Sequence, residues 1–138
     1  MDVSIGNRIT DNTSIYAGEL TALLLALRWI EDNVQLKVKP VVILTDSLSF
    51  LHSIQSGQST ARPNLLKQLL ATLNSTHINI TFCWVPSHLG IQSNSAADHY
   101  AALAITAYTV ELDIELELEE VYSLADRYIL EVAVAMVK

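Results

Sequence analysis

Residues 84–98 constrain the fold of this chain most, because this run sets out the end of a strand, a loop and the start of a helix. An apolar strand is expected to end at Trp84, and Pro86 then prevents a ladder or a helix from continuing. The small and polar residues that follow predict a turn carrying His88, and the next helix is expected to have Asp98 in its first turn. The stretch therefore predicts an imidazole in the loop after a strand and a carboxylate in the first turn of the helix that follows this loop.

A second carboxylate, Glu19, is expected inside an amphipathic helix. Residues 11–14 are polar and offer side-chain oxygens for a helix cap, and the helix is predicted to continue to about residue 32. Glu19 lies at the edge of the apolar face, where a partly desolvated carboxylate needs a partner. Alternatively, it is an exposed glutamate near the helix start that the macrodipole favours. The apolar positions step by four and three along one face: Tyr16, Leu20, Leu23, Leu27 and Ile30.

A third carboxylate, Asp46, follows a continuous apolar run at residues 41–45, which is typical of a strand that is buried on both faces. Asp46 and Ser47 are expected where this strand runs into a helix. Aspartate is also a common helix cap, so Asp46 by itself is explained equally well as a cap or as a ligand.

The other patterns alternate between helix and strand, which indicates an α/β protein. A helix is predicted over 48–56 with Gly57 as its end, and a second helix starts at Pro63. Strands are predicted at 3–10 and, with one buried face, at 78–84. Asn94 or Ser95 is expected to cap the helix that contains Asp98. The inner stripe of that helix is expected to consist of Ala97, Ala101, Ala104 and Tyr108.

The acidic charge of the chain is concentrated at its C-terminal end. The 138 residues suffice for one domain with a real core, and half of them are hydrophobic. Of the net charge of −7, only −1 arises through Val110, and −6 arises from Glu111 onward. Residues 109–118 alternate between apolar and acidic side chains, which predicts a strand with one acidic face, and 120–138 is predicted to be a helix.

Several classes of protein are disfavoured by composition. The single Cys83 excludes an internal disulfide, and one cysteine with scattered histidines gives no zinc-ligand spacing. No signal peptide is visible, and no apolar run approaches the roughly 18 to 20 residues that span a bilayer. The sequence therefore predicts an intracellular protein, cytoplasmic or nuclear, that is neither secreted nor bound to a membrane.

Three motifs in order carry a resemblance to a known family. Ser-Ile-Tyr-Ala-Gly-Glu-Leu at 14–20, Thr-Asp-Ser at 45–47 and the stretch 84–98 together resemble a type 1 ribonuclease H domain, in the style found in non-LTR retrotransposon polyproteins. The resemblance covers roughly residues 3–108. It implies a mixed sheet flanked by helices, with residues 1–108 as a partial ribonuclease H-like domain and 109–138 as an acidic strand and helix appendage.

The resemblance also implies an activity and a set of site residues. It implies a metal-dependent endonuclease that hydrolyses the RNA strand of RNA–DNA hybrids, with Mg²⁺ or Mn²⁺ as cofactor and a reverse transcriptase as a candidate partner. The implied catalytic residues are Glu19, Asp46, His88 and Asp98, of which the three carboxylates are the metal ligands. Clustered carboxylates suit this chemistry because two magnesium ions can generate the hydroxide and stabilise the leaving oxygen.

The chain departs from the family pattern at its start. The family begins with two strands, the first of which ends in a metal-binding aspartate, and neither Asp2 nor Asp11 matches that aspartate. The missing strand would leave unpaired sheet edges, so we expect residues 109–118 to supply replacement pairing within the chain or to a second copy. Three hypotheses follow: an active ribonuclease H domain, a catalytically dead remnant that binds nucleic acid or protein, and an unrelated α/β interaction module.

Overall fold

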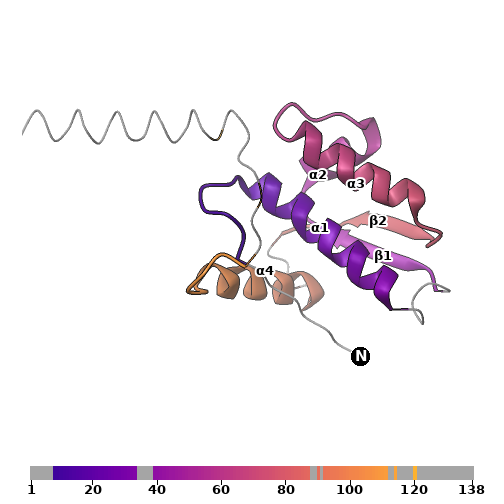
Figure 1. Cartoon of the computed structure of the whole chain (residues 1–138). Coiled ribbons are helices and arrows are strands. Elements are labelled where there is room, and N and C mark those ends of the chain that lie inside the picture. Colours follow the sequence, from indigo (N-terminus) through magenta and orange to yellow (C-terminus); the bar gives the residue numbers. More distant parts are fainter. Residues whose placement is uncertain are drawn as a thin grey trace, which may run out of the picture.

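The computed structural model describes residues 8–33, 39–87, 90, 92–111, 114 and 120, and for residues 92–94 the backbone alone. Helices and strands are interspersed along the chain (Figure 1), which confirms the α/β class. The helix α1 precedes the strand β1, the helices α2 and α3 follow it, and the strand β2 leads to α4. Their bounds are α1 Ile15–Asp32, β1 Val41–Thr45, α2 Leu48–Ser56, α3 Pro63–Ser75, β2 Ile80–Trp84 and α4 Gln92–Ile105.

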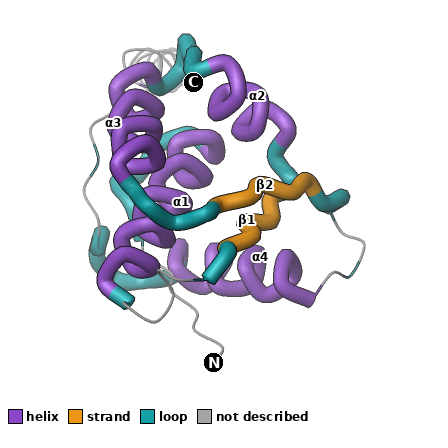
Figure 2. Tube along the Cα trace, turned by 90° about the vertical axis from the view of Figure 1, so that its right-hand side faces the viewer, coloured by secondary structure: helices purple, strands orange, loops and turns teal. Residues whose placement is uncertain are grey.

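The strands β1 and β2 form a parallel pair in which Val41 lies opposite Ile80 and Thr45 opposite Trp84. Within the described residues the sheet consists of these two strands. Two parallel strands need a crossover connection, and here α2 and α3 supply it (Figure 2). Because the strands are parallel, their carboxyl ends reach the same edge of the sheet.

The core lies between one face of this strand pair and the helices α1, α2 and α3. Phe50 of α2 meets Phe82 of β2 edge-on, with ring centroids 6.2 Å apart. Ile43 and Ile80 also pack against the core from the sheet. The buried cluster is leucine-rich, and its members are Leu20, Leu23, Leu24, Leu27, Phe50, Leu66 and Leu69. The predicted apolar face of α1 is thus confirmed as the side that covers the sheet.

The opposite face of the strand pair is open, so the prediction that 41–45 is buried on both faces is wrong. Val42 is 59% exposed and Leu44 40% exposed, and burial alternates along β1. In both views α4 lies on the far side of the strands from α2 and α3 (Figures 1 and 2). Its described side chains do not cover these two residues, and for this reason an apolar run remains half-exposed.

Three further predictions, all about helix α4, are wrong. The helix begins at Gln92, so Asn94 and Ser95 lie inside it and do not cap it, and Asp98 is not in its first turn. Side chains 95–103 are all exposed. The expected inner stripe is wrong as well, because Ala97, Ala101 and Tyr108 are exposed and Ala104 is half-buried.

At the end of β2, Trp84 is 45% exposed, so the buried face predicted for 78–84 does not extend to it. Ile78 is buried but precedes the strand.

The remaining predictions fall largely outside the described residues. Of the strand predicted at 3–10, residues 8–10 are described, and Ile9 forms a single bridge. Of the strand predicted at 109–118, residues 109–111 and 114 are described and are not in strand conformation. Of the helix predicted at 120–138, Glu120 is described and is helical.

Candidate active site

Glu19 is held by the first turns of α1. Ser14 caps the helix, as its Oγ accepts a hydrogen bond from the Ala17 N–H at 3.1 Å and its carbonyl accepts from the Gly18 N–H. The next residue after Glu19, Leu20, is fully buried and anchors the turn in the core. Glu19 itself is half-buried. Glu19 therefore lies at the edge of the apolar face, as one alternative predicted, and is not the fully exposed glutamate of the other alternative.

Asp46 follows β1, but it does not cap the next helix. The cap of α2 is Ser47, whose Oγ accepts a hydrogen bond from the Phe50 N–H at 3.2 Å. The Ser47 N–H in turn donates to Thr45 Oγ1, also at 3.2 Å. The capping role that competed with a ligand role for Asp46 is therefore taken by its neighbour.

The second and third motifs meet at the carboxyl edge of the strand pair. The indole Nε1–H of Trp84 donates to the Asp46 carbonyl at 3.2 Å, and the Val85 N–H donates to the Thr45 carbonyl at 2.9 Å. These bonds fasten the end of β2 to the junction between β1 and α2. They place the start of the loop after β2 beside Asp46, and in parallel sheets this edge is where ligands bind.

The other two predicted site residues are less well placed. Asp98 is described and exposed in the middle part of α4. His88 lies outside the described residues.

The three predicted metal ligands do not form a metal site in the described structure. No group of three or more histidine, cysteine, aspartate or glutamate side chains in the described part of the chain lies close enough to hold a metal ion. Glu19, Asp46 and Asp98 are all described, so this finding includes them. A divalent cation therefore has no three-ligand set here, and the assignment of these carboxylates as ligands stays a prediction.

Polar hydroxyls, not cations, line the surface between α1 and α2. A shallow hollow of about 770 Å³ is lined by Tyr16, Ser49, Ser53, Ser59 and Thr60 among others. The Tyr16 hydroxyl donates to Ser53 Oγ at 2.7 Å. Such groups offer hydrogen bonds but no charge that would hold a phosphate from a distance.

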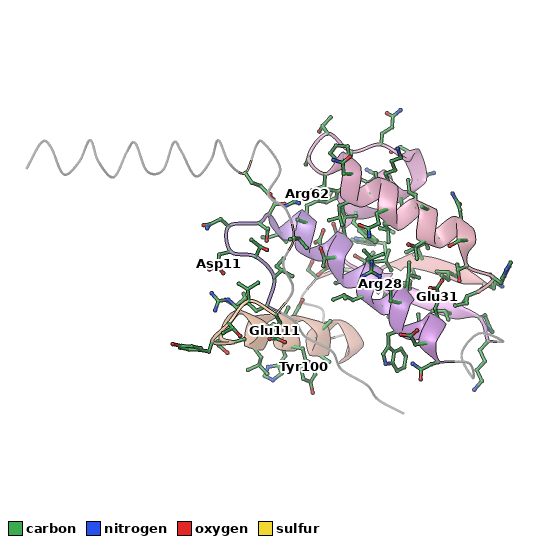
Figure 3. All side chains as sticks on the ribbon, viewed as in Figure 1. Asp11, Arg28, Glu31, Arg62, Tyr100 and Glu111 are labelled. Atoms are coloured by element: carbon green, nitrogen blue, oxygen red, sulfur yellow. The ribbon has the colours of Figure 1, made fainter. Side chains whose placement is uncertain are left out.

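Sequence patterns missed a buried ion pair that lies away from the predicted site. The guanidinium of Arg62, directly before α3, pairs with the Glu120 carboxylate, and their side chains are 4% and 11% exposed. Arg62 lies beside the first turn of α1, and Glu111 lies next to the N-terminal segment (Figure 3). No local pattern could signal the pair, because 58 residues separate its members.

Comparison with known families shows to which family the chain belongs. A sequence profile of the RNase H family matches residues 2–106, which is most of the chain. The chain belongs to the RNase H family. The match contains Glu19, Asp46, His88 and Asp98, and with it the α/β architecture described above is that of an RNase H family domain.

Beyond the RNase H profile, no curated protein matches the chain. In the described ranges, no helix has both the length and the apolar character that crossing a bilayer requires.

Proposed function

We propose that this RNase H family chain is an endoribonuclease that hydrolyses the RNA strand of RNA–DNA hybrids. The family match over residues 2–106 carries the proposal, because it contains all three motifs in order. The contact between Trp84 and Asp46 supports it, since it joins two of those motifs at one edge of the sheet. The half-buried position of Glu19 is consistent with a carboxylate that has a specific task.

The cofactor part of the proposal is a divalent cation, Mg²⁺ or Mn²⁺. Carboxylate oxygens are the ligands such cations prefer, and Glu19, Asp46 and Asp98 are the candidates. In the described arrangement these side chains do not form a three-ligand set. Cleavage assisted by a cation requires them to lie closer together than they do here.

A second candidate function is favoured by the lack of a three-ligand set among the described residues. A chain whose carboxylates stay apart can still bind a hybrid or a protein without cutting it. Double-stranded substrates of this kind are recognised largely by shape and by the 2′-hydroxyl, for which a full set of catalytic groups is not needed. On this alternative the chain is a binding module that retains the RNase H fold.

Retroelement origin is a further part of the proposal. The motif style indicates a domain from a non-LTR retrotransposon polyprotein, with a reverse transcriptase as its partner. Co-purification of the chain with such an enzyme tests this part independently of cleavage.

The deciding experiment is a cleavage assay on a labelled RNA–DNA hybrid with Mg²⁺, using the wild-type chain and Asp46→Asn. We expect cleavage of the RNA strand by the wild type and a loss of about a hundredfold or more in the variant, which is the scale of several kcal/mol in the transition state. The control is Asp32→Asn, which removes an exposed carboxylate at the end of α1.

Binding of the hybrid in EDTA, measured by fluorescence anisotropy, separates the two candidates. Binding in EDTA together with no cleavage in the Mg²⁺ assay supports the binding module and contradicts the nuclease. Equal cleavage by the wild type and by Asp46→Asn removes Asp46 from the site.

A further inference from the structure

The peptide unit that joins Asp46 to Ser47, at the end of β1, is hydrogen-bonded at both of its polar groups. The Asp46 carbonyl accepts from the indole Nε1–H of Trp84 at 3.2 Å. The Ser47 N–H donates to Thr45 Oγ1, also at 3.2 Å. Because a peptide unit is planar, bonds to its two opposite sides fix the orientation of the whole plane. The backbone dihedral ψ of Asp46 is therefore fixed by its neighbours.

The peptide unit on the other side of Asp46 is fixed as well. The Thr45 carbonyl accepts from the Val85 N–H at 2.9 Å, which continues the parallel pairing of β1 and β2 by one residue. With the planes on both sides fixed, φ and ψ of Asp46 are fixed, and the direction of its Cα–Cβ bond follows from them. The Asp46 carboxylate thus leaves the backbone in a defined direction at the carboxyl edge of the strand pair.

The bond from Trp84 differs from the other two bonds in its origin. The bond between Ser47 and Thr45 forms within one short segment, and the bond from Val85 joins two backbone groups, which most residue types can supply. Trp84 instead reaches Asp46 with its side chain, across 38 positions of the sequence. An indole offers one N–H donor and no acceptor, so the bond has a single direction. The residue type at position 84 therefore bears directly on the backbone of Asp46.

Exposure limits what this bond contributes to stability. Trp84 is 45% exposed, and Asp46 is half-buried. When the indole is removed, water can take its place at the carbonyl, so we do not expect the fold to depend on this bond. Orientation is a stricter requirement than stability, because a displacement of about 1 Å in an active site can lower the rate by about a hundredfold.

We propose that Trp84 is a positioning residue for Asp46: its indole N–H fixes the peptide plane between Asp46 and Ser47 and thereby orients the Asp46 carboxylate for hydrolysis of the hybrid. This role rests on the proposed function, in which Asp46 takes part in the reaction. It does not require Trp84 to touch the hybrid. The hydrogen bond itself is independent of that function.

The first test measures cleavage kinetics in two variants of the full chain. Trp84→Phe keeps an aromatic ring but removes the N–H, whereas Trp84→Gln removes the ring but keeps an N–H donor the same number of bonds from Cβ. We expect kcat to fall about tenfold in Trp84→Phe, on the scale of one hydrogen bond, and by less in Trp84→Gln. KM, and the Kd for the hybrid in EDTA, should stay unchanged in both variants.

The matched control is Trp29→Phe. It makes the same substitution at the other tryptophan of the chain, which is half-buried near the end of α1. We expect its kcat to equal that of the wild type.

Equal kcat values for the wild type and Trp84→Phe overturn the positioning role and leave the nuclease function intact. A larger loss in Trp84→Gln than in Trp84→Phe also overturns it, because the ring and not the N–H is then required. A raised Kd with an unchanged kcat overturns it too, since Trp84 then contacts the hybrid. Absence of cleavage by the wild type contradicts the nuclease function and, with it, any positioning role in the reaction.

The second test measures amide hydrogen exchange and does not depend on cleavage. The Ser47 N–H shares its peptide unit with the Asp46 carbonyl, so we expect it to exchange several-fold faster in Trp84→Phe than in the wild type or Trp29→Phe. Unchanged amides in the middle of α1 and α3 show that the variant is folded. Unchanged exchange at Ser47 in Trp84→Phe overturns the claim that Trp84 fixes this peptide unit, whether or not the chain cleaves a hybrid.

Discussion

Asp46 and Ser47 are neighbours, and the structure gives them different tasks. Ser47 satisfies the first turn of α2 by accepting the Phe50 N–H. Asp46 is half-buried at the end of β1, and its carbonyl receives the indole of Trp84. Because Ser47 caps α2, a capping role no longer accounts for an aspartate at position 46. This division at the residue scale is what makes Asp46 the most informative position to substitute.

The cap assignment predicts the effect of Ser47→Ala. We expect the free energy of unfolding to fall by about 1 kcal/mol, because the Phe50 N–H loses its acceptor. Urea denaturation monitored by circular dichroism measures the change. The control is Thr60→Ala, an exposed position in the loop before α3, where we expect a change within about 0.5 kcal/mol. Equal losses in the two variants would contradict the cap.

At the scale of elements, α1 and α4 differ in how they are supported. Helix α1 buries most of one face, including Leu20, Leu23 and Leu27, in the core. Helix α4 has a similar length, yet its side chains from 95 to 103 are exposed. An isolated helix of this length is marginal in water, since most helix stability in proteins comes from packing an apolar face. Asp98, one of the predicted site residues, therefore lies on the least supported helix of those described.

This difference predicts unequal amide exchange in the two helices. We expect amides in the middle of α4 to exchange at least about a hundredfold faster than those in the middle of α1, because opening α4 exposes little apolar surface. Native-state hydrogen exchange read by NMR measures both helices in one sample, so α1 is the internal control. Equal protection would show that α4 has a packing partner.

If α4 does gain such a partner when a hybrid binds, its protection should rise in the complex. That result would favour the active nuclease over the binding module, because it would bring Asp98 to a supported position.

At the scale of the whole molecule, positive charge is scarce. Among the described residues, Arg62 is buried against Glu120 and Arg8 is paired with Asp11. The exposed cations that remain in these ranges are Arg28, Lys39 and Lys67. The described residues therefore offer few phosphate contacts, and on the proposed function most of the affinity of this part of the chain for a hybrid comes from uncharged hydrogen bonds and shape.

This charge distribution predicts a shallow salt dependence of hybrid binding. Each phosphate contact contributes about −0.9 to the slope of log K against log salt, so three cations predict a slope of about −3. Anisotropy titrations between 50 and 200 mM salt, roughly the range over which such slopes are defined, measure it. Lys67→Gln should reduce the slope by about 1 if Lys67 contacts a phosphate, and Thr60→Ala should leave it unchanged. A slope steeper than about −6 would contradict this account.

The sequence alone determined the elements whose signals are local. The helix end at Gly57, the helix start at Pro63 and the polar run 11–14 that contains the cap Ser14 were visible as patterns along the chain, as was the alternation that places Ile80 and Phe82 toward the core. The order of the three motifs also sufficed to identify the family. These features depend on neighbouring residues, so one sequence contains the information for them.

The tertiary structure alone decided which surfaces are covered and which distant residues meet. The apolar run of β1 is half-exposed because no described layer covers Val42 and Leu44, and a one-dimensional pattern cannot show whether that second layer exists. The pairing of Arg62 with Glu120 joins residues far apart in the sequence. Whether Glu19, Asp46 and Asp98 share one site is likewise a question of spatial distance, and in the described structure they form no three-ligand group.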